Sequence, residues 1–83
     1  MATRTRPSEL QWSVDRWHLY GKGIHAGDGM EMRFPDGEWV EGRIESQECG
    51  RRLLFYFVHH GMTLRVTVDT EDDLLRWPEA RRR

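Results

Sequence analysis

The stretch FPDGEWVEGRIES, residues 34–46, decides the fold because it reads as a β-hairpin. Pro35-Asp36-Gly37 combines residue types that favour a tight turn. From Trp39 to Glu45 the even positions carry Val, Gly and Ile, and the odd positions carry Trp, Glu, Arg and Glu. Such alternation is typical of a strand with one buried face. The stretch therefore predicts a strand whose Val and Ile point to the core and whose tryptophan lies among charges.

Further short apolar or alternating runs follow the same pattern along the chain. They predict an all-β fold, a small five-stranded SH3-like barrel that is partly open, with an OB-like barrel as the alternative. Short helical turns are expected over residues 8–13, where Ser8 to Gln11 has the form of a capping box, and over 70–75, before the last strand. The expected core comprises Met32, Val40, Ile44, Phe55, Phe57, Leu64 and Val66.

The 83 residues suffice for one domain. We expect a disordered basic tail at 1–7, the barrel at 8–78 and a second basic tail at 79–83. A single cysteine, Cys49, leaves no intrachain disulfide and suits a reducing, cytoplasmic compartment. The chain has no apolar run of membrane-spanning length and its start lacks the apolar stretch of a signal peptide, so we expect no membrane partner.

The net charge of −1 hides an uneven distribution. Residues 7–78 contain 8 Lys and Arg against 13 Asp and Glu, and the basic excess sits at the two ends. An acidic body is a poor primary surface for nucleic acid, because such affinity comes largely from Lys and Arg neutralising phosphates. The distribution favours a protein partner with a basic surface.

Catalytic and metal sites find little support in the sequence. Cys49 has Arg51 and Arg52 nearby, which could lower its pKa, but a nucleophile also needs a base and an oxyanion hole in a pocket. His18, His25 and the pair His59-His60 lack the spacing of zinc ligands. We therefore expect a protein that is not an enzyme, with no catalytic residue, no cofactor and no metal.

The charged face of the hairpin strand is the predicted binding surface. Its residues are Trp39, Glu41, Arg43 and Glu45, with Tyr20 and Tyr56 as further aromatic candidates. Tryptophan is enriched among residues that anchor protein interfaces. The alternative for Trp39 is a ring that lies over Arg43 or a neighbouring strand and only covers the fold.

Four motifs together resemble a small bacterial domain family of unknown function that is found on plasmids and mobile elements. They are Ile24-His25-Ala26-Gly27-Asp28, Met30-Glu31-Met32, Trp39-x-x-Gly-Arg-Ile-Glu45 and Gly61-Met-x-x-Arg-Val66. The resemblance implies a setting on mobile elements and no assigned activity. The order of these features is also similar to that of the plasmid-borne dihydrofolate reductases, which assemble SH3-like barrels around a pore. Leu64 to Thr67 lacks the Val-Gln-Ile-Tyr run that lines the pore of those enzymes.

These observations predict a non-enzymatic binding module that docks on a macromolecule through an exposed strand face. Inhibition of a host defence nuclease, in the manner of anti-CRISPR proteins, is its sharpest form. One alternative is a nucleic-acid-binding barrel of Tudor or KOW type that uses Arg43, Arg51, Arg52, Arg65 and the arginine tail. Another is an enzyme formed by homo-oligomerisation around a pore.

Overall fold

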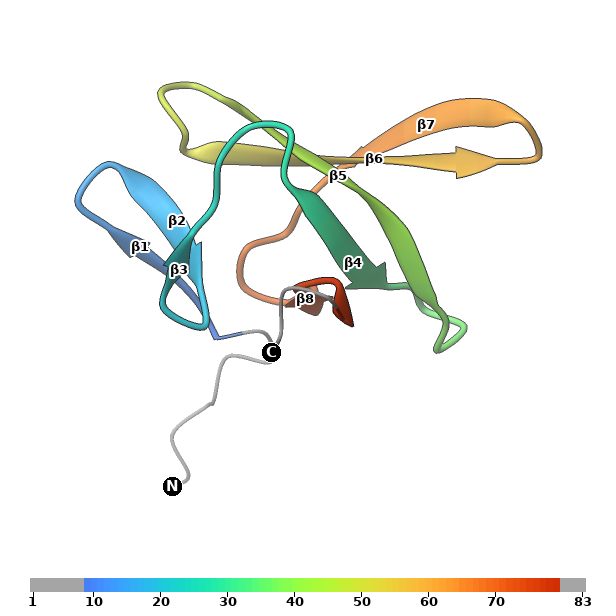
Figure 1. Ribbon diagram of the computed structural model, residues 1–83, viewed down its shortest axis with the longest axis horizontal. Coiled ribbons are helices and arrows are strands. Elements are labelled where there is room, and N and C mark those ends of the chain that lie inside the picture. Colours follow the sequence, from blue (N-terminus) through green and yellow to red (C-terminus); the bar gives the residue numbers. More distant parts are fainter. Residues whose placement is uncertain (1–8, 80–83) are drawn as a thin grey trace.

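The computed structural model describes residues 9–79, and it folds them into two antiparallel sheets (Figure 1). The smaller sheet has the order β1–β2–β3, and the larger has the order β7–β6–β5–β4–β8. The strands are β1 (Leu10–Ser13), β2 (Arg16–Leu19), β3 (Lys22–Gly23), β4 (Gly29–Arg33), β5 (Trp39–Gln47), β6 (Arg52–His59), β7 (Met62–Thr67) and β8 (Leu75–Arg76). The all-β prediction is confirmed.

The hairpin predicted around Pro35-Asp36-Gly37 forms the centre of the larger sheet. β5 pairs with β4 on one side and with β6 on the other. Gly42 lies opposite Phe57, and a Cβ on Gly42 would come within 2.2 Å of the Tyr56 carbonyl oxygen. Glycine is therefore required at this position, because a neighbouring strand passes too close for any side chain.

The core lies between the two sheets. Met32, Ile44, Phe55 and Phe57 are buried as predicted, and Val40 and Val66 are partly buried against them. The remaining core residues come from both sheets and the closing segments: Leu10, Leu19, Ile24, Met30, Leu53, Val68, Leu75 and Trp77.

Two tryptophan indoles join segments that are distant in sequence. The indole N–H of Trp77 donates to the carbonyl of Leu19 over 2.8 Å. The indole N–H of Trp17 donates to the carbonyl of Arg51 over 2.9 Å. Each ring thus buries apolar surface and satisfies its single donor, which is the usual arrangement for a packed tryptophan.

The two expected helical turns are corrected. Of the helical turn expected at 8–13, Ser8 lies outside the described residues, and Leu10–Ser13 form the strand β1. Leu10 is buried and Trp12 is half-buried between exposed neighbours, which is a period of two rather than a helical face. Residues 70–75 form no helix, because Asp69 and Asp73 bond the backbone of the turn instead: Asp69 accepts from the N–H of Glu71, and Asp73 accepts from that of Asp69.

The two sheets do not close into a barrel within residues 9–79. β7 ends one side of the larger sheet and β8 ends the other, and neither pairs with the smaller sheet. The likeness to SH3 domains stays a prediction.

The prediction of Leu64 as a core residue is wrong. Its side chain is 37% exposed, and Met62 on the same face is 63% exposed. The reason is that β7 is the edge strand of a hairpin that extends beyond the rest of the sheet (Figure 1), so part of its apolar face has nothing beneath it.

The segment 1–7 and all but Glu79 of the segment 79–83 lie outside the described residues, so their assignment as tails stays a prediction. Among residues 9–79, no helix is long and apolar enough to cross a membrane.

Candidate functional site

The larger sheet has one face packed on the core and one face turned away from it, which we call the outer face. Strand alternation and the pairing register place its residues: Gly29, Glu31, Arg33, Trp39, Glu41, Arg43, Glu45, Gln47, Arg52, Leu54, Tyr56, Val58, Thr63, Arg65, Thr67 and Arg76. The four predicted residues of β5 and Tyr56 of β6 therefore share one surface.

Tyr56 occupies the middle of a row that crosses three strands of the outer face. Arg43 of β5 lies directly opposite it on one side, and Arg65 of β7 lies opposite it on the other. The Arg65 guanidinium donates to the Tyr56 hydroxyl over 3.4 Å. Shallow hollows flank the row, and Arg43, Tyr56 and Thr63 line both of them. An aromatic ring between two guanidinium groups suits a partner that carries carboxylates beside an apolar group.

Trp39, at the start of β5 on the outer face, lies beneath the guanidinium group of Arg76. The Arg76 guanidinium carbon sits 4.1 Å from the centroid of the Trp39 ring. The same guanidinium is ion-paired with Glu31, which lies opposite Arg76 in the β4–β8 pairing. The ring is half-buried, so one of its faces is already covered by the chain itself.

The outer face is the basic side of an acidic molecule. Between Glu9 and Glu79, five of the eight Lys and Arg residues lie on it, but only three of the fourteen Asp and Glu residues do. The count of charges along the sequence favoured a partner with a basic surface. It could not show this basic face, because the arginines are far apart along the chain. The strand register brings them together.

Two candidates from the sequence lie elsewhere. Tyr20 is 55% exposed, in the turn between β2 and β3 of the smaller sheet, and does not join the outer face. Arg51 lies 5.0 Å over the ring of Trp12, in the turn between β5 and β6. Of the arginines proposed for nucleic acid, Arg43, Arg52 and Arg65 share the outer face and Arg51 does not.

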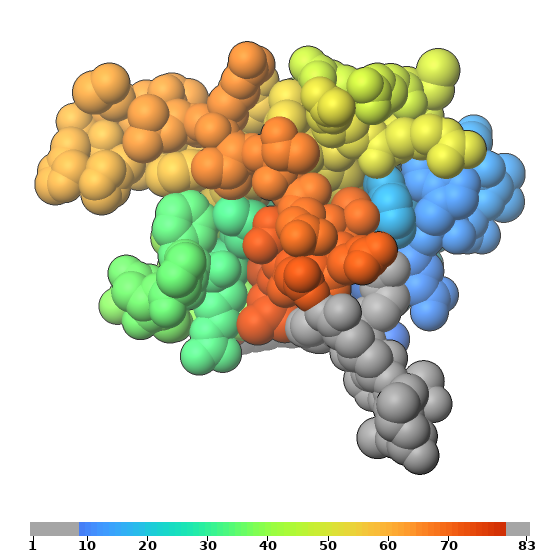
Figure 2. Space-filling view, turned by 180° about the vertical axis from the view of Figure 1, so that it is seen from behind, coloured from blue at the N-terminus to red at the C-terminus, as the bar shows by residue number. Residues whose placement is uncertain are grey.

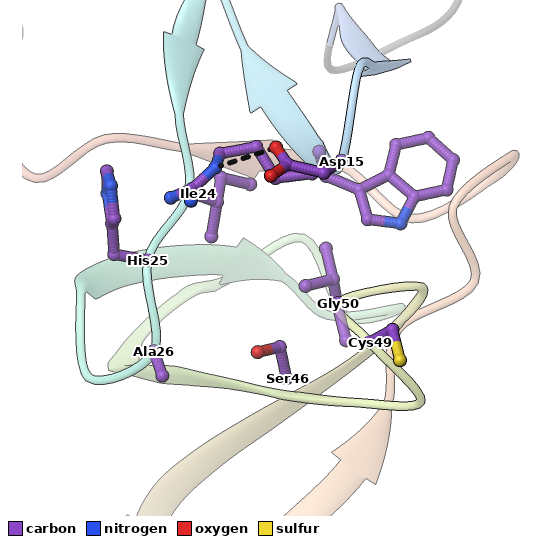
Figure 3. A pocket seen from close by; sticks show the side chains of 10 residues that line it. Asp15, Ile24, His25, Ala26, Ser46, Cys49 and Gly50 are labelled. Atoms are coloured by element: carbon purple, nitrogen blue, oxygen red, sulfur yellow. Dashed lines mark ion pairs between the residues drawn. The ribbon is translucent and has the colours of Figure 1, made fainter.

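A polar hollow between the sheets was not predicted. Its lining includes Asp15, Arg16, His25, Ser46 and Cys49. The Arg16 and Asp15 side chains form an ion pair of 3.5 Å, and His25 lies 3.8 Å from the Asp28 carboxylate. Figure 3 shows His25 and the Cys49 sulfur at opposite ends of the hollow. Over residues 9–79 no cluster of three His, Cys, Asp or Glu side chains could hold a metal ion.

An apolar groove was also missed. Phe34, Val40, Phe57 and Leu64 line it, with Asp36, Glu38 and His59 among the polar residues around them. It lies between the β6–β7 hairpin and the turn that joins β4 to β5, where the space-filling view is notched (Figure 2). The exposed Met62 side chain lies next to Leu64 on the same face of β7, towards the tip of the hairpin. The groove exists because β7 is the outermost strand, and the alternation of residues along the chain does not reveal that position.

A family model described as a domain of unknown function, DUF5348, matches residues 5–69 of this chain. The chain belongs to the DUF5348 family. The DUF5348 match spans β1 to β7 and ends before β8, so it includes Trp39 and the Arg43–Tyr56–Arg65 row but not Arg76. No curated protein and no solved structure matches this DUF5348 chain. The predicted resemblance to a family of unknown function is confirmed, and the link to plasmids stays a prediction.

Proposed function

We propose that this DUF5348 protein is a non-enzymatic binding module whose outer face docks on a carboxylate-bearing surface of another protein. The observation that supports it is the row of Arg43, Tyr56 and Arg65, which presents two guanidinium groups on either side of one aromatic ring. Arginine and tyrosine are enriched among the residues that dominate binding energy in protein interfaces.

The charge pattern favours a protein over a nucleic acid. Glu41 and Glu45 flank Arg43 on β5, and a continuous line of phosphates across the face would meet these carboxylates. Outside the outer face, eleven acidic residues stand against three basic ones between Glu9 and Glu79, which repels a long polyanion. A protein surface can place its carboxylates on the arginines and its cations on the glutamates.

Val58 supplies apolar surface beside the row. Its side chain is 68% exposed and lies on the outer face one alternation step from Tyr56. Interfaces combine such an apolar centre with a polar rim. Trp39, with one ring face covered by Arg76, stands at the margin of this surface. Inhibition of a defence nuclease, the mobile-element setting and the cytoplasmic location stay predictions.

Quantitative capture from an extract of the native host tests the proposal. Three immobilised proteins are compared: the wild type, Arg43→Glu on the outer face, and Lys22→Glu on the smaller sheet, which makes the same change of charge. We expect a protein that is retained by the wild type and by Lys22→Glu and is lost with Arg43→Glu. If the Arg43→Glu protein retains the same partner as the wild type in equal amount, the proposal is contradicted.

Titration of a labelled oligothymidine with the protein at several salt concentrations tests the alternative that the protein binds nucleic acid. We expect no binding at physiological salt. Tight binding that weakens steeply with salt and depends on Arg43 and Arg65 would replace the protein-docking proposal with nucleic-acid recognition.

A further inference from the structure

The proposed function uses the Arg65 side chain of β7 but leaves the open backbone edge of that strand unused. β7 runs for six residues at the outside of the larger sheet, whereas the opposite edge strand β8 has only two. Natural proteins protect long edges with prolines, bulges or several charges, because an unpaired row of N–H and C=O groups attracts other strands. β7 has no proline, and Arg65 is its one charged residue.

The turn before β7 fixes which backbone groups face outward. His60 and Gly61 have φ values of 51° and 76°, so they form a two-residue turn of the type that closes tight hairpins. The flanking pair His59 and Met62 then exchanges hydrogen bonds, as do the pairs at Leu64 and Val66. The N–H and C=O groups of Thr63, Arg65 and Thr67 therefore point away from β6, to the open edge.

We propose that β7 pairs antiparallel with β7 of a second copy of this chain, with a two-fold axis at Leu64. This register sets Leu64 against Leu64 of the second copy, Met62 against Val66, and Thr63 against Arg65. Thr63 and Arg65, whose backbone groups face outward, become the hydrogen-bonded pair, and Leu64 becomes a non-hydrogen-bonded pair at the axis.

The β7 edge is complementary to itself, which favours a second copy of this chain as the partner that pairs with it. The apolar residues of both strands fall on the same side, so the exposed Met62 and Leu64 side chains cover one another. Shifting the register by two residues to centre it on Arg65 would place two arginines directly opposite each other, which is unfavourable. A shift by one would put apolar side chains against the polar face.

The same register places polar groups of the two copies side by side. Antiparallel pairing brings the His59-His60 tip of one copy next to the end of β7 in the other, where the acidic turn begins at Asp69. The hairpin also extends past the body of the molecule (Figures 1 and 2), which leaves room for a second hairpin alongside it.

Disulfide trapping tests the register. In a Cys49→Ser background, which removes the exposed native thiol, we introduce Leu64→Cys. Non-hydrogen-bonded antiparallel pairs have Cα atoms about 4.5 Å apart, within the range that a disulfide spans. We expect Leu64→Cys to form a covalent dimer on mild oxidation. Val14→Cys, at a 91% exposed position far from β7 in sequence, controls for random collision and should stay monomeric.

Two further variants make the register specific. Met62→Cys alone should remain monomeric, and a mixture of Met62→Cys with Val66→Cys should cross-link, because these positions face each other across the axis. If Leu64→Cys cross-links no faster than Val14→Cys, or if Met62→Cys links to itself instead, the inference is overturned.

Backbone blocking gives an independent measurement without cysteines. Thr63→Pro removes an N–H that points to the open edge and leaves the backbone hydrogen bonds between β6 and β7 in place. Thr63→Val keeps this N–H and is the matched control. Sedimentation of the 9.9 kDa chain should show a dimer. Thr63→Pro should weaken it by about tenfold or more, as expected for one hydrogen bond lost from each copy.

Sedimentation also separates this inference from the proposed function. The Arg43→Glu protein should still form the dimer, because Arg43 lies on β5 and not at the edge. A wild-type chain that stays monomeric at every concentration overturns the inference and leaves docking by the outer face intact.

Discussion

The Arg76 guanidinium lies 4.1 Å over the centroid of the Trp39 ring, and Glu31 holds that guanidinium in place through an ion pair. Three adjacent strands, β5, β4 and β8, thus contribute one residue each to a small cluster on the outer face. Trp39 is surrounded in the sequence by the charged residues of its own strand, but the cation that covers its ring comes from a different strand, β8. This contact connects the last strand of the sheet to its centre.

Replacing Trp39 by Ala should therefore lower the free energy of unfolding by about 2 kcal/mol, from lost apolar burial and a lost cation–π contact. A double-mutant cycle with Arg76→Ala, measured by chemical denaturation, should give a coupling of about 0.5–1 kcal/mol. Glu41→Ala, an exposed change on the same strand face, should be nearly neutral. A coupling near zero would mean that the two side chains do not interact in solution.

Gly42→Ala should be strongly destabilising. The added Cβ would lie 2.2 Å from the Tyr56 carbonyl oxygen and 2.7 Å from the Phe55 ring, so the central strands must move apart. We expect a loss of about 3 kcal/mol or more in unfolding free energy. The matched control is Gly29→Ala on β4, whose Cβ would meet only the Pro78 side chain at 3.6 Å. Equal melting temperatures for the two variants would contradict the close approach of β6 to Gly42.

Ile44→Ala and Leu64→Ala should separate the core from the edge. Ile44 is fully buried, and its truncation should cost about 2–5 kcal/mol. Leu64 is 37% exposed, so its truncation should cost less than half as much in a dilute sample. Urea denaturation of both variants at low protein concentration measures this difference. An equal loss of unfolding free energy in both variants would contradict the assignment of β7 to the edge of the sheet.

The β1–β2 turn stores backbone strain at Val14. This residue has φ of +61° and is 91% exposed, and a β-branched side chain is unfavourable in that conformation. Val14→Gly should therefore raise the melting temperature, by relief of about 1 kcal/mol or more. Val58→Gly, at an exposed position on regular strand β6, should lower it. A loss of stability in Val14→Gly would show that the turn does not hold this conformation.

Local alternation was enough to predict much of the fold. The hairpin from Phe34 to Ser46 and the inward positions of Met32 and Ile44 follow from a period of two and turn chemistry. These features depend on neighbours in sequence, so the sequence shows them directly.

Strand order was not predictable in the same way. Whether β7 is inside the sheet or at its edge depends on long-range pairing, and the alternation of Leu64 and Val66 looks the same in both cases. The same limit applies to the outer face. Arg43, Tyr56 and Arg65 come together only through the register of three strands. The prediction of a helical turn at 70–75 was wrong for another reason. Acidic side chains that can cap a helix can equally accept hydrogen bonds from the backbone of a non-helical turn.

The most direct test of outer-face docking is the dissociation constant of the captured partner for three proteins: wild type, Arg43→Glu and Lys22→Glu. We predict that Arg43→Glu weakens binding by at least about thirtyfold, as expected for a residue worth about 2 kcal/mol at the centre of an interface. Lys22→Glu should bind as the wild type does. Equal affinities for Arg43→Glu and the wild type, with both proteins folded, would contradict the account.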